Sequence, residues 1–221
     1  MTAAAELVHI SKSYGRREVL TEFDFELKAG EMVAVTGPSG SGKSTLLNLV
    51  GLLERPDRGQ VRLFGADAPM PRTARSTRYL RHHFGYLFQN FALVEDATVE
   101  QNLEIALAYV HRRSPRKNLI REALEQVGLG GSENQKAFTL SGGEQQRVAI
   151  ARLLLKPCDI ILADEPTGAL DPDNRDSVLG LLRELNQRGK SILIATHDPA
   201  VENSCVRTVH LDSPRRVSQT P

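Results

Sequence analysis

The sequence has little cysteine, few aromatic residues and almost no net charge. Its 221 residues include two cysteines and no tryptophan, and 28 Lys and Arg stand against 27 Asp and Glu, which gives a formal net charge of +1. Two cysteines without CxxC spacing exclude a disulfide scaffold and provide no zinc cluster. A net charge this close to zero does not predict that the protein surface as a whole attracts nucleic acid. We therefore expect a protein of a reducing cytosol with no nucleic acid partner.

Long hydrophobic runs are also missing. The longest apolar runs fall far short of the roughly 20 residues that span a bilayer. The N-terminus, MTAAAELVHI, lacks the basic start and the apolar stretch of a secretory signal. If this protein serves a membrane process, we expect the membrane part to be another chain.

Apolar patterning predicts an α/β chain. Residues 7–10 and 23–27 alternate apolar and polar side chains, which is typical of half-buried antiparallel strands and indicates an edge sheet. Continuous apolar runs predict covered strands of a central sheet, which we expect to be mixed, at residues 32–36, 160–163 and 192–195. Between residues 90 and 137 helix formers dominate. We expect one domain, with residues 1–89 and 156–221 as its core and residues 90–155 as a helical subdomain.

A glycine-rich phosphate loop follows the apolar run at residues 32–36 and precedes a helical pattern at residues 44–53. Its glycines let backbone N–H groups close around phosphate oxygens, and the helix start adds its positive dipole end. Lys43 supplies charge for the outer phosphates, and Ser44 offers a hydroxyl to Mg²⁺. The predicted loop, GPSGSGKST, comprises Gly37, Pro38, Ser39, Gly40, Ser41, Gly42, Lys43, Ser44 and Thr45.

Two further runs place polar side chains at the carboxyl ends of predicted strands. ILADEP ends in Asp164 and Glu165, and ILIAT is followed by His197. In an open α/β sheet ligands gather at this edge, so Asp164 suits the Mg²⁺ shell and Glu165 suits a general base for the attacking water. His197 is placed to sense the γ-phosphate. The alternatives are a capping pair before Pro166 and an ordinary satisfied histidine.

The segment LSGGEQQR, at residues 140–147, predicts a second phosphate cradle. Ser141 and Glu144 have the spacing of a capping box, which explains a helix start at this point. The box does not explain Gly142 and Gly143, which cost helix stability and are useful where a backbone approaches a phosphate.

The phosphate loop, LSGGEQQR and the acidic strand end, in this order, resemble the ATP-binding cassette (ABC) ATPases. This resemblance implies that Ser141, Gly142, Gly143 and Glu144 act in trans on ATP held by the phosphate loop of a second cassette. It also assigns three residues outside the motifs above. Gln89, in YLFQN, matches the glutamine loop that contacts Mg²⁺ and faces a membrane partner. Tyr14 matches the aromatic ring that stacks on adenine. Asp171, in GALDP, matches the loop that meets the phosphate loop of the opposite cassette, and it also fits a helix cap.

The resemblance implies a P-loop NTPase fold of the RecA-like type, with an antiparallel β edge sheet and an α-helical subdomain. It implies an ATPase that uses ATP and Mg²⁺, with Glu165, His197, Gln89 and Lys43 as catalytic residues and Ser44, Gln89 and Asp164 at the metal. Two cassettes would close as a homodimer at the cytoplasmic face of the cell membrane, peripheral to a separate transmembrane permease.

Within the family, TGALDP and FQNFALVEDATVEQNL resemble the group that serves macrolide, lipoprotein, bacteriocin and haem export. A cassette of the cell-division type, which signals through a membrane partner without transport, has a similar motif set and is the alternative. Soluble cassettes of DNA repair or iron–sulfur assembly are a third class. The transported substrate cannot be read from this chain, because selectivity belongs to the permease.

Residues 70–83, MPRTARSTRYLRHH, are more basic than their surroundings. Such a stretch is either a solvated arginine face or a surface that approaches anionic headgroups.

Overall fold

The strands near the N-terminus form an antiparallel sheet. The computed structural model describes residues 3–108 and 115–212. The sheet consists of β1 (Ala3–Tyr14), β2 (Arg17–Lys28), β4 (Arg58–Leu63) and β5 (Ala66–Asp67) in the order β2-β1-β4-β5, and all its pairs are antiparallel. The predicted edge sheet is confirmed, with β1 and β2 longer at both ends than the alternating runs that indicated them.

A second sheet is parallel throughout. It has the order β6-β7-β8-β3-β9, with bounds β3 (Met32–Thr36), β6 (Phe84–Leu87), β7 (Ile160–Asp164), β8 (Ser191–Ala195) and β9 (Arg207–His210). The expectation of a mixed central sheet was wrong, because the antiparallel strands pair only among themselves. The parallel strands are joined by crossovers that contain helices, which return the chain in the same direction each time.

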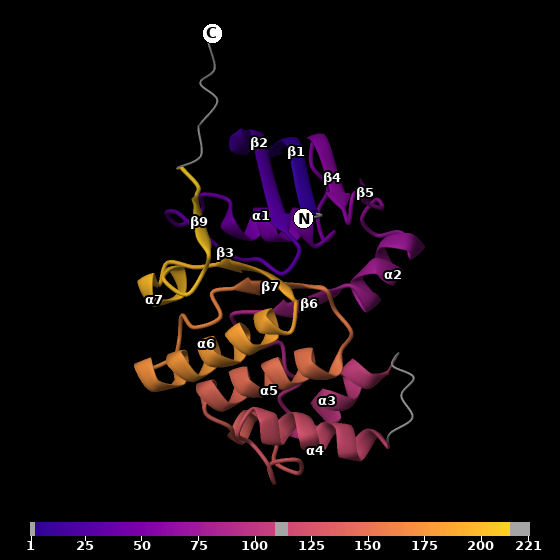
Figure 1. The fold of residues 1–221 in the computed structure, drawn as a ribbon, viewed down its shortest axis with the longest axis vertical. Coiled ribbons are helices and arrows are strands. Elements are labelled where there is room, and N and C mark those ends of the chain that lie inside the picture. The colour runs from indigo at the N-terminus through magenta and orange to yellow at the C-terminus, as the bar shows by residue number, and fades with distance from the viewer. Residues whose placement is uncertain (1–2, 109–114, 213–221) are drawn as a thin grey trace.

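The helices lie on both faces of the parallel sheet (Figure 1). On one side, α1 (Lys43–Val50) lies with the antiparallel sheet, and on the other side lie α3 (Val99–Leu107), α4 (Arg116–Gln126), α5 (Gly142–Leu155) and α6 (Pro172–Gln187). The remaining elements are α2 (Ala74–His82), α7 (Pro199–Glu202) and a 3-10 turn at Ala137–Thr139. The helices α3, α4 and α5 lie within the predicted helical region, but its boundaries at residues 90 and 155 remain a prediction.

One predicted helix end was wrong. The pattern extended the helix after the phosphate loop to residue 53, but α1 stops at Val50, Gly51 caps it, and Leu52 has a left-handed φ of 57°. None of the helices in the described part of the chain combines the length and the apolar character that crossing a bilayer requires.

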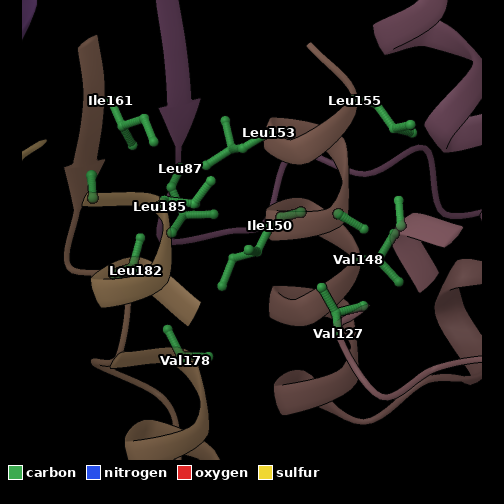
Figure 2. Packing of buried hydrophobic residues seen from close by; sticks show 14 of the residues in the cluster. Leu87, Val127, Val148, Ile150, Leu153, Leu155, Ile161, Val178, Leu182 and Leu185 are labelled. Carbon is green, nitrogen blue, oxygen red and sulfur yellow. The ribbon is translucent and has the colours of Figure 1, made fainter. Parts of the chain in front are cut away.

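Two hydrophobic cores sandwich the parallel sheet, because alternate strand residues point to opposite faces. Val33, Val35 and Leu193 belong to the core shared with α1 and the antiparallel sheet, here called the α1-side core. Ile192 and Ile194 belong to the core shared with α3 to α6, called the α5-side core, part of which is drawn in Figure 2. A sheet covered on both faces leaves only its edges and strand ends for polar side chains.

Candidate active site

A cavity of about 810 Å³ brings together most of the predicted nucleotide site, and its volume lies within the range of ligand pockets. The loops after β3, β6, β7 and β8 contribute to it, so it lies at the carboxyl edge of the parallel sheet, as the strand-end argument predicts. Its lining residues are Tyr14, Arg17, Val19, Gly37, Pro38, Ser39, Gly40, Gly42, Lys43, Ser44, Thr45, Gln89, Asp164, Glu165 and His197.

The phosphate loop needs glycine at two positions for both conformation and space. Gly37 has a φ of +142°, and a Cβ there would lie 2.3 Å from the carbonyl oxygen of Leu211. Gly42 has a φ of +106°, and its Cβ would lie 2.6 Å from Cγ1 of Val19. A side chain at either position would force Leu211 or Val19 to shift. The backbone can therefore close tightly around a phosphate, as the sequence predicts.

Lys43 lies folded over this loop. Its Nζ donates to the carbonyl oxygen of Gly37 at 2.8 Å and to that of Pro38 at 3.3 Å. The ammonium is thus held at the mouth of the loop, where the outer phosphates of a nucleotide would take over these donors.

Ser41 is the one residue of the predicted loop that does not line the cavity. Its side chain is buried, and its Oγ has no hydrogen-bond partner among the described residues. Its backbone N–H donates to Pro38 O at 3.0 Å, closing a turn inside the loop. Ser41 therefore shapes the loop, and a direct contact between its side chain and a nucleotide stays a prediction.

Arg17 is a cavity residue that the sequence reasoning missed. It begins β2, and its Nη2 donates to the carbonyl oxygen of Gly40 at 2.8 Å. A Cβ on Gly40 would lie 2.4 Å from the same Nη2 atom, so the guanidinium rests directly on the loop. Nothing in the local pattern around Arg17 signals this contact, because it depends on how the antiparallel sheet packs on the phosphate loop.

Tyr14 ends β1 at the cavity wall, and 46% of the residue is exposed. Its hydroxyl donates to Oε2 of Glu54 and lies 3.5 Å from Oγ1 of Thr45. Partial burial, followed by the hydrogen bond to the Glu54 carboxylate, raises the pKa of Tyr14 above its ordinary value. The anchored hydroxyl fixes the ring, which is the preorganisation that stacking on a base needs.

Glu165 and His197 meet at the carboxyl ends of β7 and β8. Nδ1 of His197 lies 2.9 Å from Oε1 of Glu165, and the Glu165 side chain is 15% exposed against 70% for His197. Glu165 holds a left-handed φ of 47°, and its N–H donates to Ala195 O at 2.9 Å. Asp164 is the last residue of β7, as predicted, and lines the same cavity.

The predicted capping box at the start of α5 is confirmed. The N–H of Ser141 donates to Oε2 of Glu144 at 2.8 Å, and the N–H of Glu144 donates to Oγ of Ser141. Oγ of Ser141 also donates to Oε2 of Glu144 at 2.8 Å, and this hydrogen bond, followed by the one from the Ser141 N–H, lowers the pKa of Glu144. Ser141 and Gly142 are exposed, and neither lines the nucleotide cavity. The second cradle therefore faces outward, away from the phosphate loop of its own chain.

Gly143 is buried against the next helix. A Cβ on Gly143 would lie 2.3 Å from Oδ1 of Asn174, which accepts from Nη1 of Arg147 at 2.7 Å. Asn174 in turn donates from Nδ2 to Asp171 at 2.6 Å. These contacts connect the start of α5 to the loop before α6.

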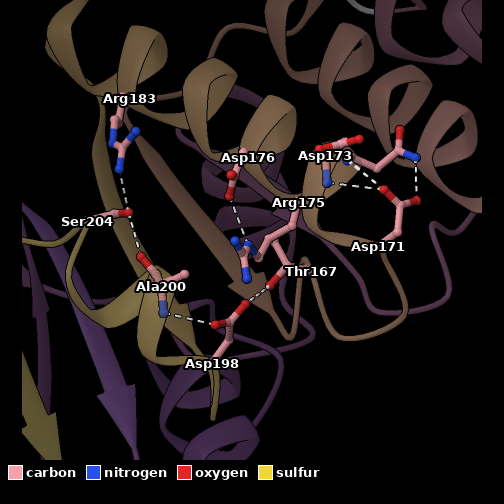
Figure 3. A network of polar contacts seen from close by, with 10 residues as sticks. Thr167, Asp171, Asp173, Arg175, Asp176, Arg183, Asp198, Ala200 and Ser204 are labelled. Carbon is pink, nitrogen blue, oxygen red and sulfur yellow. Dashed lines mark hydrogen bonds and ion pairs between the residues drawn. The ribbon is translucent and has the colours of Figure 1, made fainter.

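Asp171 caps α6, as predicted. Its carboxylate accepts from the N–H groups of Asp173 and Asn174, both at 3.1 Å, and the hydrogen bonds from Asn174 lower its pKa (Figure 3). In the same figure, Oγ1 of Thr167 donates to Asp198, the residue after His197, at 3.4 Å. The loops that carry Glu165 and His197 are thus linked beyond their direct contact.

Comparisons with known proteins agree with this geometry. A family model described as "ABC transporter" matches residues 20–168. The macrolide export ATP-binding/permease protein MacB of Salmonella choleraesuis (strain SC-B67) is 40% identical over 226 residues, covering 100% of this chain and 35% of that protein. The protein of the same name from Escherichia coli is 42% identical over 216 residues, covering 96% of this chain and 33% of that protein. The chain spans about a third of the length of these relatives.

Solved structures of ABC cassettes share the fold. The dimeric structure of MJ0796, a bacterial ABC transporter cassette, has a TM-score of 0.85 at 34% identity, with 97% of this chain and 99% of that chain covered. A dimeric post-hydrolysis state of MJ0796 bound to ADP and Pi has a TM-score of 0.86 at 33% identity, with the same coverage. The predicted family and fold class are confirmed: the chain belongs to the ABC transporter family and is an ABC-type ATPase cassette.

Proposed function

We propose that this chain is the ATP-hydrolysing cassette of a membrane exporter and that it works as a homodimer with Mg·ATP between two copies. One observation is the main support for the dimer. The phosphate loop, Asp164, Glu165 and His197 surround one cavity, whereas Ser141 and Gly142 are exposed outside it. Within one chain, therefore, the phosphate loop and the second cradle do not form one site. A second copy can supply the second cradle to the phosphate loop of the first. The two related MJ0796 cassette structures are dimeric, which supports this arrangement.

The hydrolytic step depends on Glu165 in this proposal. Its carboxylate orients the attacking water and accepts its proton, while the contact with Nδ1 of His197 holds that carboxylate at the rim of the cavity. Lys43 exchanges its two loop carbonyls for phosphate oxygens when ATP binds. Ser141 and Gly142 of the second copy donate hydrogen bonds to the γ-phosphate from the start of α5, where helix N–H groups are free.

The donor set fits Mg²⁺. Ser44, Gln89 and Asp164 line one cavity and offer a hydroxyl, an amide oxygen and a carboxylate, the hard oxygen ligands that Mg²⁺ prefers. No group of three or more His, Cys, Asp and Glu in the described ranges is placed to hold a metal ion. These three residues would thus hold Mg²⁺ together with the phosphates of the nucleotide, where it offsets their charge.

A groove beside Gln89 is the proposed docking site for the permease. It has a volume of about 380 Å³ and is lined by apolar residues that include Leu80, Phe88, Ile105 and Leu153. Ile105 is 55% exposed, and Phe88 directly precedes Gln89, so the groove and the nucleotide cavity share one segment. A permease helix bound in this groove would displace the segment that contains Gln89 whenever the helix moves.

Arg152 connects the same segment to α5. Its guanidinium donates to Phe91 O at 2.9 Å and to Ala92 O at 2.6 Å, and burial lowers its pKa. The helix that begins with Ser141 and the loop that follows Gln89 are therefore attached to each other. This attachment supports coupling between closure of the dimer and the permease.

The export role and the place at the cytoplasmic face of the membrane rest on the MacB relatives, whose names combine an ATP-binding part and a permease. That the permease is a separate chain stays a prediction, because those relatives carry both parts under one name. Selectivity for the exported substrate would reside in the permease.

Replacing Glu165 by Gln tests the proposed function. The Glu165→Gln protein should bind ATP as the wild type does, lose at least about a hundredfold in ATP turnover, and form an ATP-dependent dimer on size-exclusion chromatography. The matched control is Glu122→Gln on the exposed face of α4, which should change neither turnover nor association. Undiminished turnover in Glu165→Gln would overturn the assignment.

A further inference from the structure

The function proposed above leaves a group of arginines at the start of α2 without a role. Arg75 and Arg78 lie on α2, and Arg72 lies two residues before it; all three are exposed, and they form what we call the basic face of α2. The opposite side of the helix holds it in place, because Ser76 is buried and Tyr79 and Leu80 pack against the α1-side core. The helix is thus fixed with its arginines directed away from the protein.

These arginines lack partners of opposite charge. The sequence contains no acidic residue between Asp67 and Glu95. In residues 3–108 and 115–212, no carboxylate lies within ion-pair distance of Arg72, Arg75 or Arg78. Other partly exposed arginines of the protein do have such partners, including Arg62 with Asp67 and Arg188 with Glu184. A cluster of like charges without counter-charges attracts an anionic surface.

Exposed apolar side chains flank the basic face. Met70, just before it, is 49% exposed, and Phe64 is 38% exposed with its ring 5.2 Å from that of His83. Basic side chains next to protruding apolar ones are typical of surfaces that lie at the headgroup level of a membrane.

The docking site proposed for the permease would place this face beside the membrane. Thr77, Leu80 and Arg81 of α2 line the groove proposed for the permease, whereas Arg72, Arg75 and Arg78 do not. A permease seated in the groove would bring the bilayer alongside α2. In this respect the inference rests on the proposed function.

We propose that the basic face of α2 binds the anionic headgroups of the membrane beside the permease. Lipid phosphates suit it better than an acidic protein segment, because two of the arginines lie on one fixed helix, the third lies just before that helix, and all three are outside the groove and the nucleotide cavity. Each cassette would then be attached at two places. The basic face of α2 would bind the bilayer, and the groove would bind the permease.

Vesicle co-sedimentation tests the proposal with the 221-residue protein. It should bind vesicles of phosphatidylcholine with about 30 mol% phosphatidylglycerol and not vesicles of phosphatidylcholine alone. Each arginine near an anionic surface contributes about fivefold in partitioning, so Arg75→Gln/Arg78→Gln should bind about thirtyfold more weakly. The matched control, Arg116→Gln/Arg121→Gln on exposed positions of α4, removes the same charge and should bind about as the wild type does.

Three results would overturn the proposal: equal binding by both double variants, equal binding to neutral and anionic vesicles, or binding only to an acidic poly-glutamate peptide. The last result would assign the face to an acidic protein segment. Nucleotide binding and turnover, measured on the same preparations, should be unchanged in both double variants, because neither pair touches the nucleotide cavity. Failure of the lipid contact is therefore distinguishable from failure of the ATPase assignment.

Discussion

At the scale of single residues, the phosphate loop is completed by a contact from outside its own motif. The guanidinium of Arg17 donates to Gly40 O, whereas the neighbouring Arg16 is exposed and makes no such bond. We expect Arg17→Gln to weaken ATP binding by about threefold to tenfold, because it removes a charge-assisted hydrogen bond that orients the loop and a positive charge beside the phosphates. Titration with a fluorescent ATP analogue measures this, and Arg16→Gln is the control with the same charge change. Equal affinities of the two variants would contradict the role of Arg17.

The two glycines of the second cradle should respond differently to a methyl group. Gly143→Ala meets Oδ1 of Asn174 at 2.3 Å, and Asn174 is held by Arg147 and Asp171, so we expect a loss of about 1–3 kcal/mol in the free energy of unfolding. Gly142→Ala has its nearest neighbour, Cζ of Phe91, at an ordinary 3.7 Å, and alanine favours helix. Its stability should therefore change little or rise. Urea denaturation compares the midpoints of the two variants. Equal midpoints would show that the Asn174 side chain moves aside without loss of stability.

At the scale of elements, sequence patterns located β1, β2, β3, β7, β8 and the motifs, but they did not predict β4, β5 or β6. The run at residues 32–36 and the glycines after it predicted β3 and the phosphate loop, since a covered strand and a phosphate cradle each impose strong local requirements. The end of α1 was missed because Leu52 adopts a left-handed conformation that its side chain does not indicate. The pairing of β6 with β7 and the contact of Arg17 with Gly40 join segments far apart in the chain, so no local pattern encodes them.

The start of α5 should depend on pH through Glu144. Its pKa is lowered by the hydrogen bonds from Ser141, so its contribution to stability is present above the unfolded-state pKa, about 4.3, and is lost as the pH falls through the lower folded-state pKa. We expect Glu144→Gln to reduce the free energy of unfolding at pH 7 by at most ~0.5 kcal/mol, because the group is partly exposed. The difference should shrink as the pH falls below about 4.3. Urea midpoints at pH 7 and pH 3.5 measure it, with Glu122→Gln as control; a penalty of the same size at both pH values would exclude the ionised cap as its cause.

At the scale of the whole molecule, the proposed shared site predicts a pattern of complementation between two inactive variants. Lys43→Ala disables the phosphate loop. Gly142→Asp places a carboxylate where the partner's γ-phosphate would lie, while an acidic residue at a helix start leaves the fold intact. In a mixed dimer, the phosphate loop of the Lys43→Ala chain faces the second cradle of the Gly142→Asp chain, so both defects lie in one site. The other site combines two intact parts. An equal mixture should therefore regain about a quarter of wild-type turnover, since half of the dimers are mixed and each has one working site.

The matched control mixes Lys43→Ala with Glu165→Gln, whose side chains line the same cavity of one chain. Each site of that mixed dimer then contains one defect, so no activity should return. If both mixtures stayed inactive, the second cradle would act within its own chain or not at all. If both regained activity, exchange of Lys43 between copies would be required, which the folding of its ammonium over Gly37 O of the same loop opposes. Recovery in the first mixture alone requires that each nucleotide be bound by two chains, which is what the outward-facing start of α5 implies.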